Sequence, residues 1–305
     1  MTFVIDILFD AMHFSGPIIL TSLAGVYAYK ADVINIGLDG MMLFGAFISA
    51  LLIFFFGSYF IGLLGAIILG ALLGILFSYF GITRKANFII TGFAINLLAA
   101  AVGVYTLALL GVNNINVRAE TTDMMIRLDL PLIKDIPVLG EIVSGHTVFT
   151  YVAFISIFLM HVLMYHTRFG VHVRVSGENP DAARSVGIKV NKVKYLAIIL
   201  GGVLSAFAGF NVGVEQLAAY TPELTAGTGF IAIAAIYCAG GSPLKASAYA
   251  VLFGLMRALS VNLSLVIGGI AGLLEVIPYI TIVFVLTSIA YMRHKNTNVR
   301  SYANE

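Results

Sequence analysis

The chain has 305 residues, of which 60% are hydrophobic and only 10% are charged, and its formal net charge is +2. A soluble domain of this length needs more charge to cover its surface, so the composition excludes one and predicts a protein dissolved in lipid. The small net charge gives no indication of a nucleic-acid partner, and the single cysteine excludes a disulfide framework and a cysteine-based metal site.

Apolar stretches long enough to cross a bilayer hold most of the chain. We expect about nine transmembrane helices, within a range of about eight to ten. The expected spans are residues 13–29, 33–56, 59–80, 88–111, 147–165, 195–214, a short span at 229–241, 246–263 and 276–292. The predicted fold class is therefore an all-α polytopic membrane protein, built as a single domain over residues 1–305.

The two long polar loops predict how the chain is oriented. Residues 166–194 carry six basic and two acidic side chains, whereas residues 112–146 carry three basic and five acidic ones. Lys and Arg accumulate in cytoplasmic loops, so we expect 166–194 inside the cell and 112–146 outside. The remaining basic groups, at Lys30, 84–85, Lys245 and 293–300, then also lie inside if the N-terminus is external and the C-terminus cytoplasmic.

Two glycine-rich segments, near residues 33–42 and 225–232, interrupt the hydrophobic spans. Asp39 and Thr228 each lie between two glycines of these segments. A broken helix at membrane depth is tolerated only where it faces protein or a water-filled cavity, and paired interruptions often mark a transport path. The other glycines are expected mainly to let helices approach closely.

A few polar or aromatic side chains in the spans are candidates for a substrate pathway: Asn35, Asp39, Phe93, Asn96, Thr228 and Arg257. Arg257 is the clearest, because it lies about 18 Å along a continuous helix from Lys245, and a charge at that depth is costly. The more common alternative for Arg257 is a structural pair with a carboxylate, or a span that ends earlier. Asn96 suits a hydroxyl or ring nitrogen, but an interhelical hydrogen bond explains it slightly better.

The cytoplasmic loop contains the signals of a short helix. Asn179 is a favourable N-cap, Pro180 suits the first helical position, and Asp181 lies where the helix dipole favours an anion. Ala182 and Ala183 favour a helix, and Gly187 suits a left-handed cap, which gives roughly two turns. The alternative is an ordinary solvated loop. A rigid cytoplasmic helix is what an ATP-driven permease needs to receive force from a separate motor subunit.

Three segments resemble the permease subunits of bacterial ABC importers for simple sugars, nucleosides and branched-chain amino acids, most of all the nucleoside and simple-sugar branch. Residues 33–42 read VINIGLDGMM, against the family's N-I-G-x-E-G-M-M. Residues 177–188 read GENPDAARSVGI, against G-E-N-P-x-A-A-x-x-x-G-I, and residues 225–234 read TAGTGFIAIA, against S-A-G-x-G-F-I-A-L-A. The resemblance covers residues 13–292, with Asp39 where Glu is usual and Thr228 where a basic residue is common.

The resemblance implies a multi-pass permease in a bacterial cytoplasmic membrane that translocates nucleosides and does not itself hydrolyse ATP. It implies three protein partners: an ATPase that carries ATP and Mg, a second permease chain that is identical or homologous, and an external solute-binding lipoprotein. The residues implied to couple the permease to the ATPase are Gly177, Glu178, Asn179, Pro180, Asp181, Ala182, Ala183 and Gly187.

Two other functions are kept as alternatives. The first is a permease for a simple sugar. The second belongs to another class, a secondary transporter that works alone, which would use buried carboxylates as ion or proton relays. Only Asp39 is a fair candidate for such a carboxylate, and no filter motif or ring of charges indicates a channel.

Overall fold

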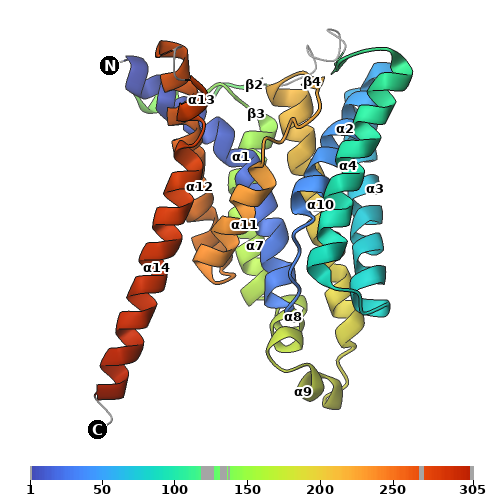
Figure 1. Cartoon of the computed structure of the whole chain (residues 1–305), viewed down its shortest axis with the longest axis vertical. Helices are drawn as coiled ribbons and strands as arrows, with labels where there is room; N and C mark the ends of the chain where they lie inside the picture. The colour runs from blue at the N-terminus through green and yellow to red at the C-terminus, as the bar shows by residue number, and fades with distance from the viewer. Residues whose placement is uncertain (1, 118–126, 131–135, 137, 268–270, 303–305) are drawn as a thin grey trace.

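The computed structural model describes residues 2–117, 127–130, 136, 138–267 and 271–302, and most of them are helical (Figure 1). Eight of the described helices are long and apolar enough to cross a membrane, and α11 (Thr228–Ala239) is a shorter apolar helix. The eight are α1 (Thr2–Lys30), α2 (Leu38–Phe56), α3 (Tyr59–Ser78), α4 (Phe88–Leu110), α7 (Val148–Tyr165), α10 (Val190–Phe210), α12 (Pro243–Val266) and α14 (Ile277–Tyr302). The predicted all-α polytopic membrane fold is confirmed.

Shorter elements connect these helices. Two π-helical turns, η1 (Tyr79–Thr83) and η2 (Asn211–Gln216), continue α3 and α10. The remaining helices are α6 (Leu139–Val143), α8 (Arg168–Glu178), α9 (Pro180–Ser185) and α13 (Ala271–Leu274). Two-residue strands form two antiparallel pairs, β1 (Ile115–Asn116) with β4 (Ala219–Tyr220), and β2 (Arg127–Leu128) with β3 (His146–Thr147).

Local sequence explains where several helices begin. The Asn87 side chain accepts a hydrogen bond from the Ile89 amide at 2.8 Å and caps α4. Ser58 accepts one from the Ile61 amide and caps α3. Each cap satisfies an amide that has no partner within its own helix.

The core lies around α10, which packs against α1, α2 and α3. Glycines make this close approach possible. A Cβ atom on Gly202 would lie 2.3 Å from the Gly70 carbonyl oxygen of α3, and one on Gly209 would collide with the Met42 carbonyl oxygen of α2. The small residues at these crossings therefore let the helix backbones pack closely. Close packing is expected in a bilayer, because the lipid tails are as apolar as the helices and the hydrophobic effect does not drive the helices together.

The two polar loops lie at opposite ends of the bundle (Figure 1). The short strands and α6 lie at the upper end in this view, and α8 and α9 lie at the lower end. The N-terminus is at the upper end and the C-terminus at the lower end, so the termini lie at opposite ends of the bundle. Which end faces the cytoplasm stays a prediction, and residues 118–126, 131–135 and 137 of the predicted external loop lie outside the described residues.

Both predicted interruptions are present. Residues 31–37 are not helical and α2 begins only at Leu38, while no helix joins Gln216 to Thr228. The first span differs from its prediction at residues 13–29, because α1 already begins at Thr2. Two acidic residues lower the hydropathy near the N-terminus, so the start of α1 is not apparent in the sequence. Asp6 is exposed, and Asp10 accepts a hydrogen bond from the Asn262 side chain at 2.7 Å.

Candidate functional site

The two interrupted helices meet at one carboxylate. Asp39, in the first turn of α2, accepts a hydrogen bond from the Gly229 amide in the first turn of α11, with Oδ1 and N 2.8 Å apart. Its other oxygen, Oδ2, accepts one from the Thr225 hydroxyl at 3.2 Å. An amide in the first turn of a helix has no acceptor within its own helix. For the Gly229 amide of α11, the acceptor is the Asp39 carboxylate in the first turn of α2.

Gly229 makes this meeting possible because it has no side chain. A Cβ atom at this position would lie 2.4 Å from the Cα of Asp39 and 2.7 Å from its amide nitrogen. Those are backbone atoms, which cannot turn aside as the end of a side chain can. The sequence Gly-Thr-Gly at the start of α11 therefore serves a backbone contact.

Arg257 reaches the same place from α12. Its Nη1 donates a hydrogen bond to the Thr228 hydroxyl, and its guanidinium lies 5.8 Å from the centre of the Phe14 ring. Among the described residues, no carboxylate lies close enough to Arg257 to form an ion pair. The predicted alternative of a structural pair thus has no carboxylate partner within the described part of the chain.

A cavity of about 180 Å³ opens beside this cluster. Its wall includes four polar residues, Arg257, Ser260, Glu275 and Tyr279, and four apolar ones. The Tyr279 hydroxyl donates a hydrogen bond to the Ala226 carbonyl at 3.1 Å, which ties α14 to the segment before α11. Hydroxyl and guanidinium groups around a small cavity suit a polar ligand rich in hydroxyls or ring nitrogens.

Two of the predicted pathway residues instead hold the break before α2. Asn96, on α4, accepts a hydrogen bond from the Gly40 amide at 2.8 Å and donates one to the Ile36 carbonyl at 3.1 Å. Asn35 accepts a hydrogen bond from the Gly37 amide at 3.0 Å. Both side chains satisfy backbone groups that the missing helical turn leaves without partners. Phe93 lies on the surface of α4, with 48% of its area exposed.

The structure places a second carboxylate in the membrane that sequence reasoning missed. Glu215 lies in η2 and is buried. It accepts hydrogen bonds from the Tyr59 hydroxyl at 2.7 Å and from the Asn211 side chain at 2.8 Å. The four-residue spacing of Asn211 and Glu215 was the available signal, because it puts two polar groups on one helix face inside an apolar run.

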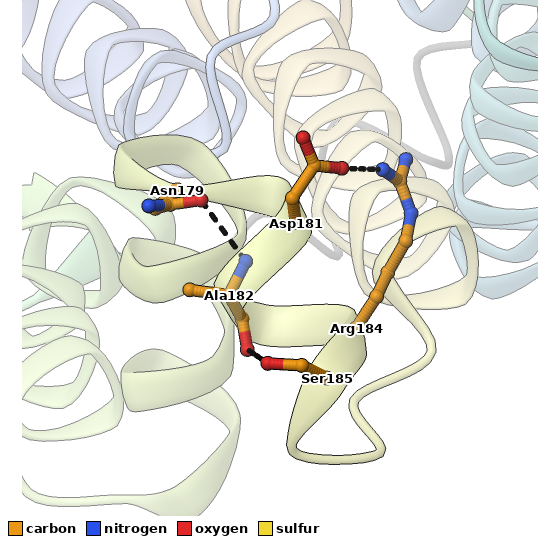
Figure 2. Close-up of polar contacts among 5 residues, drawn as sticks. All are labelled: Asn179, Asp181, Ala182, Arg184 and Ser185. Carbon is orange, nitrogen blue, oxygen red and sulfur yellow. Dashed lines mark hydrogen bonds and ion pairs between the residues drawn. The ribbon is translucent and has the colours of Figure 1, made fainter.

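The predicted cytoplasmic helix is present as α9, directly after α8 (Figure 2). Asn179 accepts a hydrogen bond from the Ala182 amide at 3.0 Å, as an N-cap does. Asp181 and Arg184 form an ion pair at 2.6 Å on the outer surface. Gly187 has a φ of +85° and ends the helix in the left-handed conformation that was predicted for it.

The residues of this segment divide into an outer and an inner face. Glu178, Asn179, Asp181 and Ala182 are exposed, and so is Val186, with 73% of its area in contact with solvent. Ala183 is fully buried, so its side chain holds α9 against the rest of the chain. Gly177 also faces inward: a Cβ atom there would lie 2.1 Å from the Lys30 carbonyl oxygen at the end of α1.

Comparison with known proteins places the chain among transport permeases. Residues 7–286 match the family model described as "Branched-chain amino acid transport system / permease component". The guanosine ABC transporter permease NupQ of Bacillus subtilis is 31% identical, over 91% of this chain and 88% of the relative. The nucleoside ABC transporter permease NupC of Lactococcus lactis subsp. cremoris is 32% identical, over 91% and 90%.

More distant similarities agree with this. The glucose ABC transporter permease TsgB13 of Haloferax volcanii is 26% identical over 92% of this chain and 76% of the relative. Among solved structures, an ABC transporter in an inward-facing conformation matches with a TM-score of 0.52 at 14% sequence identity, covering 94% of this chain and 85% of the other. At that identity the match concerns the fold alone.

Proposed function

Because this chain belongs to the family of branched-chain amino acid transport system permease components, we propose that it translocates nucleosides as the permease subunit of an ATP-driven importer. It is a multi-pass protein of the cytoplasmic membrane. The proposal of a nucleoside is supported by two relatives named for guanosine and nucleosides, each more than 30% identical over most of its length.

The observation that carries the proposal is the junction of the two interrupted helices beside a cavity whose wall includes Arg257, Ser260 and Tyr279. Arg257 borders this cavity and donates a hydrogen bond to the buried Thr228 hydroxyl, and Asp39 offsets the charge of Arg257 without forming a direct ion pair among the described residues. A site with balanced charge and several hydrogen-bonding groups suits an uncharged ligand that carries ribose hydroxyls and base nitrogens.

The power for transport is proposed to come from a partner. This chain carries no phosphate-binding loop, so ATP and Mg are assigned to a separate ATPase that binds the outer face of α9. A second permease chain, identical or homologous, completes the pathway, and an external solute-binding lipoprotein delivers the substrate. Closure of the ATPases on ATP moves α8 and α9 and switches access from outside to inside.

Purification of the tagged chain from its native membrane in mild detergent tests this function. We expect a stoichiometric ATPase to co-purify and radiolabelled guanosine to enter proteoliposomes only when ATP is supplied. A pure homo-oligomer that transports guanosine without an ATPase would overturn the proposal in favour of a secondary transporter that works alone.

A simple sugar is the second candidate substrate, because one relative is named as a glucose permease. Competition separates the two candidates. Unlabelled uridine should reduce guanosine uptake by the complex at least tenfold, and ribose or glucose at the same concentration should leave it unchanged. The reverse pattern would assign the complex to a sugar.

A further inference from the structure

Two cavities follow one another at the end of the bundle where α8 lies. The larger, of about 380 Å³, is bordered by Tyr29, Lys30, Glu178 and Tyr237. The smaller, of about 10 Å³, lies deeper, between α1, residues 33–36 and α11. A cavity of that size holds about one water molecule, so it is far too small to admit a nucleoside.

A pair of tyrosines stands where the larger cavity gives way to the smaller one. Tyr29 and Tyr237 line both cavities. Their rings meet edge to face, with centroids 5.4 Å apart and planes at 89°. Tyr29 lies in the last turn of α1 and Tyr237 in the last turn of α11, so this contact joins the ends of two helices.

The Tyr29 ring is also enclosed from behind. Gly241, in the turn after α11, leaves so little room that a Cβ atom there would lie 2.3 Å from the Tyr29 ring. The ring is thus held between Tyr237 and this turn. A shift of the end of α1 relative to α11 would withdraw the ring from both at once.

The end of α1 is in direct contact with the segment that leads into α9. Gly177, in the last turn of α8, packs on the Lys30 carbonyl, and a Cβ atom at Gly177 would lie 2.1 Å from that oxygen and 3.0 Å from the Asp32 amide. Lys30 directly follows Tyr29. A displacement of α8 therefore reaches the Tyr29 ring through one backbone contact.

We propose that Tyr29 and Tyr237 form the inner gate of the transport path and that the Gly177 contact transmits motion of α8 and α9 to this gate. The inference rests on the proposed function, because a gate driven from α9 requires an ATPase on α9. The alternative is an aromatic pair that only holds α1 and α11 together. If the pair is a gate, loss of one ring exposes the small cavity to reagents from the side of α8. If the pair only joins α1 and α11, loss of one ring leaves this exposure unchanged.

Labelling of a cysteine at a half-buried position of the small cavity measures that access. In a Cys238→Ala background, which removes the only native cysteine, Ile36→Cys places a thiol in the wall of the small cavity. The permease with its ATPase is placed in inside-out vesicles and treated with a membrane-impermeant maleimide. We expect Tyr29→Ala to raise the labelling rate at least fivefold. Tyr29→Phe keeps the ring and should label at the parent rate, as should Tyr291→Ala, at an exposed position on α14.

An unchanged labelling rate in Tyr29→Ala, with the protein folded and complexed, would overturn the gate. If Tyr29→Ala does not fold, Tyr237→Ala supplies the same test from the other side of the contact. Because this measurement needs no ATP, it also holds if no ATPase co-purifies with the parent. In that case the proposed importer function is refuted, while the labelling rate of Tyr29→Ala still tests whether the two tyrosines form a gate.

Gly177→Ala tests the transmission. In the parent we expect addition of ATP to change the labelling rate of Ile36→Cys severalfold. In those Gly177→Ala complexes that still contain the ATPase, the labelling rate should no longer respond to ATP. Gly16→Ala is the matched control, since a Cβ atom there meets its nearest neighbours at an ordinary 3.8 Å. A full ATP response in Gly177→Ala would refute the proposed link.

Discussion

Replacement of Gly229 by alanine tests whether the junction of α2 and α11 is the structural centre of the transport path. The new Cβ atom would lie 2.4 Å from the Cα of Asp39, and van der Waals contact needs at least 3.4 Å. The start of α11 must therefore withdraw by about 1 Å, which takes the 2.8 Å hydrogen bond from the Gly229 amide to Asp39 beyond hydrogen-bond range.

The energetic cost follows from these two effects. Loss of a hydrogen bond to a charged acceptor costs about 1.5–3 kcal/mol. Strain from an added methyl group in a packed interior costs about 1–3 kcal/mol. Together they predict a loss of roughly 2.5–6 kcal/mol. Because the same displacement moves Thr228 away from Arg257, we also expect guanosine uptake to be abolished.

Thermal unfolding in detergent and guanosine uptake in proteoliposomes measure the two consequences separately. Gly16→Ala, the control substitution within α1, should leave uptake intact, because a Cβ atom there meets its nearest neighbours at an ordinary 3.8 Å. The reasoning is refuted if Gly229→Ala unfolds at the temperature of the parent and transports guanosine at the same rate.

Three further changes follow from the same structure. Arg257→Leu should reduce guanosine uptake at least tenfold with normal expression; a variant that fails to fold would instead support a structural role. Val186→Asp should leave the fold intact and prevent co-purification of the ATPase, whereas Ala183→Arg, at a buried position, should destabilise α9 itself; equal ATPase recovery with Val186→Asp would contradict the assignment of this surface. Burial against Phe9 lowers the pKa of His146, so the unfolded chain binds a proton more readily and thermal stability should fall as the pH drops below about 6.5; a His146→Phe variant should weaken this dependence, and an unchanged pH profile would exclude the role of His146.

Hydrophobic patterning predicted most of the fold because spans and their interruptions are local properties. The breaks at 33–42 and 225–232 were visible as glycines in apolar sequence, and the caps of α9 were visible as Asn179 and Gly187. The start of α1 was not, since Asp10 depressed the local hydropathy and its partner Asn262 lies 252 residues away.

Contacts within the candidate site were less predictable for the same reason. Asp39 and Thr228 were singled out separately, but the bond that joins their segments links residues 190 positions apart. Asn96 could serve a ligand or the backbone, and only the position of α2 shows that it binds the backbone. Glu215 was overlooked because the polar run after it resembled a loop, whereas η2 carries it into the bundle.

The charges around the junction of α2 and α11 also affect which solutes can cross the membrane. A helix start carries about half a positive elementary charge, and two of them converge here beside the guanidinium of Arg257. Two carboxylates, Asp39 at the junction and Glu275 in the wall of the adjoining cavity, together offset this sum, so the charges around the junction are close to balanced. Balanced charges provide no excess carboxylate to attract Na⁺, K⁺ or hydronium, so an uncharged solute can pass while the ion gradients across the membrane are preserved.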